Sequence, residues 1–151
     1  MPIKNLLVPA LLIGLACAAL PVLAGGLFSA TGAVVAMMGD ELYVGEAEGH
    51  LGGAGTLAIH AQKNPALRCI GQFTSSADLG GSGQLQCSDN TTATFKFTRL
   101  SAYRGYGIAT FSRGEMSFAY GFAPDEAAPY LTLPAGKRLM HNGTEFALVD
   151  R

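Results

Sequence analysis

The sequence contains no tryptophan and has few charged residues, histidines and cysteines. Charged residues make up 14% of the 151 positions, and ten Lys and Arg nearly balance eleven Asp and Glu. Proteins dedicated to nucleic-acid binding normally carry a strongly basic face, so this charge balance argues against a nucleic-acid partner. The three His and three Cys leave few ligands for a metal centre. The 49% of hydrophobic residues argues against a disordered chain.

Residues 1–24 have the features of a secretory signal in their usual order. Lys4 is followed by a long uncharged, mainly apolar run, and Val22 and Ala24 stand at the −3 and −1 positions of a cleavage site before Gly25. We therefore predict an exported protein, periplasmic or extracellular, whose mature domain spans residues 25–151.

Two alternatives for this segment stay open. The apolar run approaches the roughly 18 residues that a membrane-spanning helix needs, so it could remain as an anchor. Gly14-Leu15-Ala16-Cys17 also resembles the lipidation signal of bacterial lipoproteins, although Gly14 replaces the usual Leu. A membrane is accordingly expected as a partner only if Cys17 is lipidated or the signal is not cleaved.

Cleavage before Gly25 would leave Cys69 and Cys87 as the cysteines of the mature chain. An even number of cysteines in an oxidising compartment indicates a disulfide. If their strands are joined by a turn, the two residues face each other about Asp78, inside the turn-like stretch 74–80. Directly opposed residues of an antiparallel pair lie close enough for a disulfide. A zinc site would need two further ligands at suitable spacing, so we predict a Cys69–Cys87 disulfide.

A glycine-led segment occurs three times. Residues 51–57 (LGGAGTL) recur as residues 79–85 (LGGSGQL), and residues 104–109 (RGYGIA) form a weaker third copy. Each copy leads into a run that alternates between apolar and other residues, then a turn, then a second alternating run. Alternation with a period of two indicates strands, and three such units in a row predict an antiparallel meander.

The second run of each unit places its apolar residues on one strand face. These residues are Leu67, Cys69 and Phe73 in the first unit, Ala93, Phe95 and Phe97 in the second, and Met116, Phe118, Tyr120 and Phe122 in the third. Two glycines separated by one residue leave one face of a strand bare, which allows bends, bulges or the close approach of another segment. A phosphate-binding loop is disfavoured because no helix is expected after any glycine pair.

Further strands are expected on both sides of the repeats. They are residues 31–37, 41–49, 130–133 and 137–149, the last of them folded at Asn142-Gly143, which is a strong hairpin signal. Residues 122–129 are expected to be a connector, and no helix is predicted after residue 24. The predicted fold class is a single all-β domain, in which an antiparallel β-meander of about ten short strands forms a sandwich or a partly closed barrel.

The best candidate for metal binding is the group Glu46, Glu48 and His50. These are alternate residues of one predicted strand, so their side chains share a face and offer two carboxylates and an imidazole. The alternative is that they form the solvated face of a half-buried strand.

Other chemistry has little support in the sequence. No Gly-x-Ser-x-Gly motif is present, so we assign no catalytic or cofactor-binding residue and expect no cofactor. Arg68 and Lys96 should point outward and could form a basic stripe for an anionic partner, or could simply keep the surface soluble. We expect an exported, non-enzymatic β-domain that binds an unknown protein or envelope ligand. The alternatives are a small exported hydrolase with a site assembled from distant loops, and a lipid-anchored lipoprotein.

Overall fold

A computed structural model describes residues 29–76, 79–143 and 145–151. The predicted export signal at residues 1–24, including Cys17, lies outside these residues. No helix in the described part of the chain is long and apolar enough to cross a membrane.

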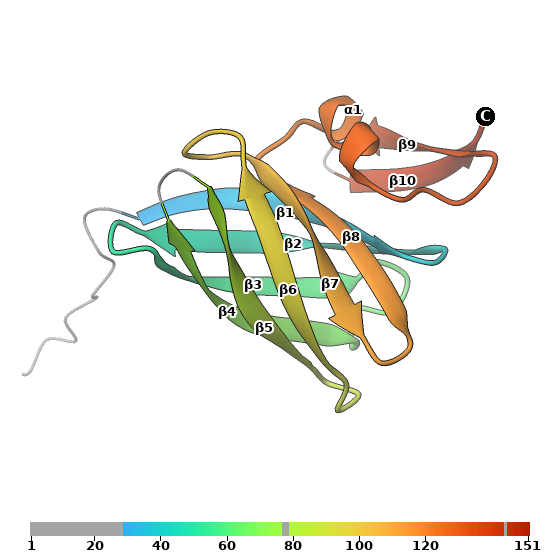
Figure 1. Cartoon of the computed structure of the whole chain (residues 1–151). Coiled ribbons are helices and arrows are strands. Elements are labelled where there is room, and N and C mark those ends of the chain that lie inside the picture. Colours follow the sequence, from blue (N-terminus) through green and yellow to red (C-terminus); the bar gives the residue numbers. More distant parts are fainter. Residues whose placement is uncertain (1–28, 77–78, 144) are drawn as a thin grey trace, which may run out of the picture.

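Eight antiparallel strands form a closed barrel in chain order (Figure 1). The strands are β1 (Ser29–Met38), β2 (Glu41–His50), β3 (Ala54–Ala61), β4 (Arg68–Ser76), β5 (Gly80–Cys87), β6 (Thr92–Arg99), β7 (Gly105–Phe111) and β8 (Gly114–Tyr120). Each strand pairs with the next, and residues 34–37 of β1 pair with residues 117–120 of β8 to close the ring. The predicted all-β meander is therefore confirmed. The expectation of a sandwich or a partly closed barrel is wrong, because the first and last strands of the meander pair with each other.

The remaining two strands form a sheet of their own. β9 (Lys137–Asn142) and β10 (Glu145–Asp150) pair as the hairpin predicted from Asn142-Gly143. They follow a short helix, α1 (Pro124–Ala127), and a 3-10 turn, η1 (Ala128–Tyr130). The prediction that no helix follows residue 24 is therefore wrong. The sequence did carry a signal for this helix, because Pro at its start and acidic residues in its first turn favour helix formation. The strand expected at residues 130–133 does not form either.

The C-terminal segment covers one side of the barrel from the outside (Figure 1). Its buried residues Ala127, Leu131 and Leu139 pack against outward-facing residues of β1, β2 and β8, which are Val35, Met37, Leu42 and Ala119. The ring of Tyr130 stacks between those of Tyr106 and Phe122, with centroids 4.6 and 4.9 Å away. The apolar pattern of residues 130–133 thus reflects packing on the barrel.

Phe122 is a further correction to the predicted pattern. Met116, Phe118 and Tyr120 do face the barrel interior as expected, but Phe122 belongs to the outer cluster. β8 ends at Tyr120, and Gly121 adopts a φ of +73°, a conformation that glycine accepts without strain. The chain therefore leaves the barrel wall before Phe122 can continue the alternation.

One end of the barrel is filled by side chains and fastened by the disulfide. Cys69 and Cys87 lie directly opposite each other on β4 and β5, with their Cα atoms 3.9 Å apart, and their sulfurs are bonded. The predicted pairing and register are confirmed. Large side chains fill the interior at this end, among them Tyr43, Phe111 and Met116, each at most 4% exposed.

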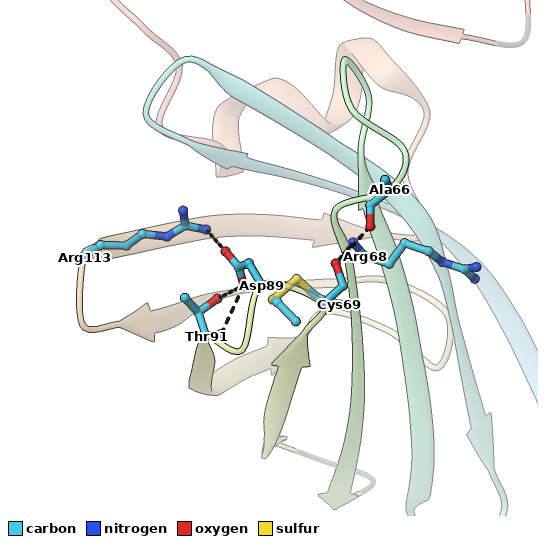
Figure 2. Close-up of polar contacts among 8 residues, drawn as sticks. Ala66, Arg68, Cys69, Asp89, Thr91 and Arg113 are labelled. Carbon is cyan, nitrogen blue, oxygen red and sulfur yellow. Dashed lines mark hydrogen bonds and ion pairs between the residues drawn. A yellow bond between two sulfur atoms is a disulfide. The ribbon is translucent and has the colours of Figure 1, made fainter.

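Polar contacts join the turns around the disulfide (Figure 2). Ser88 Oγ donates a hydrogen bond to the Ala66 carbonyl at 2.9 Å and accepts one from the Arg68 amide at 3.1 Å. Asp89 accepts hydrogen bonds from the amide and hydroxyl of Thr91, which lower the pKa of its carboxyl group. Arg113 lies 3.8 Å from the same carboxylate. These contacts bring the β3–β4, β5–β6 and β7–β8 turns together at the closed end.

Candidate functional site

Five glycines of the repeats lie on the inner wall of the barrel, each opposite an aromatic residue of the following strand. The pairs are Gly55 with Phe73, Gly81 with Phe97, Gly83 with Phe95, Gly105 with Tyr120 and Gly107 with Phe118. A methyl group added at any of these glycines would collide with the ring opposite it and with backbone. The glycine pairs predicted that another segment would approach the strand closely. At these five glycines, the approaching groups include the aromatic rings, which lie across the bare backbone.

The aromatic rings pack against one another around the interior. Phe73 and Phe97 meet edge to face with their centroids 5.5 Å apart, Phe97 and Tyr120 at 5.9 Å, and Phe95 and Phe118 at 5.8 Å. Edge-to-face contact is a favoured geometry for aromatic pairs. The result is a continuous aromatic wall contributed by β4, β6 and β8.

The aromatic wall borders a cavity of about 640 Å³ that opens at the end opposite the disulfide. Phe95, Phe118 and Leu57 are buried residues of its lining, whereas Phe73, Phe97, Tyr120 and Ala47 are partly buried. Eight strands make a barrel just wide enough to be filled by side chains or to hold one small ligand. The cavity volume falls within the range of about 300–1,000 Å³ that is typical of ligand pockets.

Small inward-facing residues explain why this end is hollow. β1 and β2 contribute Ala30, Gly32, Ala47 and Gly49 to the lining, whereas the same faces carry Met38 and Tyr43 towards the closed end. A methyl group added at Gly49 would have no atom within 4 Å. The interior therefore changes from filled to empty along the barrel axis.

Large apolar residues are exposed on the loops around the mouth. Leu51 of the β2–β3 loop is 84% exposed, Leu79 before β5 79%, and Tyr103 of the β6–β7 loop 67%. These three loops are at the same end of the barrel because alternate connections of an up-and-down meander share an end. Exposed apolar residues that gather at one end of a protein are more typical of a binding site than exposed apolar residues scattered over its surface.

Among the described residues of the cavity lining, Arg99 is the one Arg or Lys. It continues the inward series of Phe95 and Phe97 at the end of β6. Its guanidinium donates hydrogen bonds to the backbone carbonyls of Ala102 at 3.0 Å, Ser76 at 3.4 Å and Ser101 at 3.5 Å. The ion pairs found in the described residues do not include Arg99.

Tyr120 contributes a phenol to the same lining. Burial raises the pKa of Tyr120 above its ordinary value of 10.0, and the nearby positive charge of Arg99 acts in the opposite direction. Tyr120 lines the cavity and lies across Gly105. The lining therefore adds a guanidinium and a phenol to a mainly apolar and aromatic wall.

The metal candidate lies on the outer face of β2. Glu46 is paired with Ala33 and Ala58, Glu48 with Thr31 and Thr56, and His50 reaches the rim of the cavity. Groups of three or more His, Cys, Asp or Glu close enough to hold a metal ion do not occur within the described residues. A metal at Glu46, Glu48 and His50 remains an untested prediction.

Arg68 and Lys96 are both exposed on the outer face, as expected, but they are not neighbours. Arg68 is the first residue of β4, whereas Lys96 is opposite Ser82, which pairs with Thr74 near the other end of β4. The outer face between them carries an uncharged row of paired residues, Thr56, Gln72, Gln84, Thr94 and Thr110. A partner for a basic stripe remains a prediction without further support.

Comparison of the chain with protein-family models, curated proteins and solved structures found no match. The functional interpretation therefore rests on the cavity. Sequence reasoning missed Arg99 as a site residue, although a charged residue at a position that the alternation assigns to the interior was a usable signal.

Proposed function

We propose that this protein binds a small, mainly apolar molecule in the open end of its barrel. The observation that carries the proposal is the cavity of about 640 Å³ bordered by Phe73, Phe95, Phe97, Phe118 and Tyr120. Ligand sites are typically concave, lined mostly by apolar and aromatic side chains, and supplied with a few polar groups. The proposal includes the predicted export, so the ligand would be met in the periplasm or outside the cell.

The contrast between the two barrel ends supports this role. Protein interiors are normally packed to the density of organic crystals, and the closed end follows this rule with Tyr43, Phe111 and Met116. At the open end, small residues face large rings across empty space, and apolar residues surround the entrance. An apolar guest would replace water against these surfaces, which is favourable at roughly 25 cal/mol per Å² buried.

A hydrolase in this cavity has no specific observation in its favour. Nucleophilic catalysis needs a base such as His held within hydrogen-bond reach of a nucleophile and oriented by a third group. The described cavity residues include His50, Ser29 and Ser75, but Ser75 Oγ donates its hydrogen bond to the Gly53 carbonyl. Asp and Glu are not among the described residues of the lining. Binding is therefore the function that the geometry supports best.

Titration with a neutral apolar fluorophore, N-phenyl-1-naphthylamine, tests the proposal. The fluorescence of this dye should rise on binding and saturate at one dye per protein. Ala47→Trp should abolish the rise, because the indole would fill space beside the aromatic wall. Ala58→Trp is the matched control, since Ala58 is exposed on the outer face of the adjoining strand.

Thermal unfolding of both variants should show that the barrel is intact. If the dye does not bind to the wild-type protein, or if Ala47→Trp and Ala58→Trp bind it equally, the cavity is not the binding site and the proposal is wrong.

A further inference from the structure

We infer that the ligand is an amphiphile whose apolar part enters the aromatic cavity while an oxyanion, a carboxylate or a phosphate, binds Arg99 at the mouth. This inference rests on the proposed binding function and adds the chemical class and the orientation of the ligand. The observation that carries it is the placement of the Arg99 guanidinium at the entrance of a mainly apolar space.

The guanidinium is held in position before any ligand arrives. Its hydrogen bonds to the carbonyls of Ser76, Ser101 and Ala102 connect the end of β4 to the β6–β7 loop. These contacts use three of the five N–H donors of an arginine, which leaves donors for a ligand. A preorganised guanidinium loses less conformational freedom on binding than a mobile side chain does.

The three contacts that Arg99 makes with other described residues are all to neutral carbonyls, which do not neutralise its charge. Within the described residues, carboxylates pair instead with Arg104, Arg113 and Lys137, and the lining contains no acidic side chain. The planar guanidinium matches a carboxylate or a phosphate with two parallel hydrogen bonds. Low-dielectric walls beside the charge would strengthen this attraction.

The order of residues along β6 sets the orientation of the ligand. Phe95, Phe97 and Arg99 are alternate residues on the same inner face, running from the buried middle of the barrel to the mouth. The exposed fraction of Phe95 is only 3%. An apolar chain that enters tail first would lie against the two rings and leave its charged end near Arg99.

Four probes with the same alkyl chain and different heads test the inference. Tridecanoate and dodecyl phosphate carry oxyanions, dodecanol is neutral, and dodecyltrimethylammonium is cationic. Each would displace N-phenyl-1-naphthylamine from the wild-type protein below its micelle concentration. We expect at least one oxyanion to bind about tenfold more tightly than dodecanol, the gain of one charge-assisted hydrogen-bonded contact. We expect the cationic probe to bind least.

Arg99→Gln should lower the affinity for the oxyanion about tenfold more than the affinity for dodecanol, so that the preference for the oxyanion is lost. Arg68→Gln is the matched control, because Arg68 is exposed on the outer face of β4. If Arg99→Gln does not fold, the Nε–H resonance of Arg99 in the wild-type protein replaces it. That resonance should shift on addition of the preferred oxyanion and not on addition of dodecanol.

The results separate the inference from the proposed function. If dodecanol displaces the dye as well as both oxyanions do, or if the preference survives Arg99→Gln, the inference is overturned and binding of an apolar molecule still stands. An unmoved Arg99 resonance also overturns the inference. If the dye itself does not bind, both fail.

Discussion

At the scale of single residues, the glycines and the rings opposite them make the cavity wall. An aromatic side chain needs room above the backbone across from it, and Gly55, Gly83 and Gly107 provide that room. The sequence showed the glycine pairs and the aromatic alternation, so the inner face could be predicted. The register of the strands decides which glycines lie under a ring and which border empty space. The sequence predicted this register for only one pair of strands, the pair that carries Cys69 and Cys87.

Gly107→Ala should destabilise the barrel, and Gly49→Ala should not. The new methyl group at position 107 would meet the Lys96 carbonyl and the ring of Phe118, whereas at position 49 it would enter open space. We expect Gly107→Ala to lower the free energy of unfolding by about 1–3 kcal/mol, the cost of overpacking. Gly49→Ala should change it by no more than about 0.5 kcal/mol. Urea unfolding of both variants measures the difference, and equal losses would contradict this description of the wall.

At the scale of elements, local hairpins could be predicted from the sequence but long-range closure could not. The strands β1 to β8, the β9–β10 hairpin and the Cys69–Cys87 register follow from alternation and turn residues that are close in sequence. The β1–β8 pairing joins residues 34–37 to residues 117–120. The alternation of apolar and polar residues along a strand indicates which face is buried, but it does not specify so distant a partner strand. The continuous apolar run Val34–Met37 did carry a signal, because a strand buried on both faces loses its alternation.

The C-terminal hairpin should stabilise the barrel through its inward face. Leu139 of β9 is 7% exposed in the outer cluster, whereas its neighbour Met140 is 41% exposed. Leu139→Ala should lower the free energy of unfolding by about 2–3 kcal/mol, as expected for truncating a buried leucine. Met140→Ala is the control and should cost less than about 1 kcal/mol. Similar effects of the two substitutions in urea unfolding would mean that the hairpin does not pack as described.

The disulfide should contribute stability without affecting the cavity. The two cysteines are 18 residues apart in sequence, and closing a loop of this size stabilises by about 3 kcal/mol in the chain-entropy model. The Cys69→Ala, Cys87→Ala double variant should lose about this amount in urea unfolding. Its affinity for N-phenyl-1-naphthylamine should remain that of the wild-type protein, because the disulfide lies at the opposite end of the barrel. A weakened dye affinity in a folded variant would contradict the separation of the two ends.

At the scale of the whole molecule, the barrel has a filled end that supports the fold and a hollow end available for binding. The sequence predicted a compact all-β domain but not this division, because the volume of a cavity depends on which side chains face one another across the barrel. Tyr43 at the closed end is buried, and Tyr120 beside the cavity is partly buried. Burial raises the pKa of Tyr43 at the closed end and that of Tyr120 beside the cavity above 10.0.

These tyrosines should make the protein less stable at alkaline pH. A phenol with a higher pKa in the folded state holds its proton more tightly there than in the unfolded chain. The stability that follows from this raised pKa is therefore fully present below about pH 10 and is lost as the pH rises through the folded-state pKa. Tyr120→Phe should make the free energy of unfolding fall less steeply above pH 10 than in the wild-type protein. Tyr103→Phe is the control, since Tyr103 is 67% exposed; equal slopes for the two variants would contradict the burial of Tyr120.

The most direct test of the central claim is an NMR titration of the isotope-labelled protein with dodecanol. The ligand cavity predicts chemical-shift changes that saturate together at residues of the open end, including Ala47, Phe73, Phe97 and Tyr120. Residues near the Cys69–Cys87 disulfide and the outer row from Thr56 to Thr110 should not move. Shifts confined to the outer face, or no shifts at any concentration below saturation of the alcohol, would show that the open end of the barrel is not a binding site.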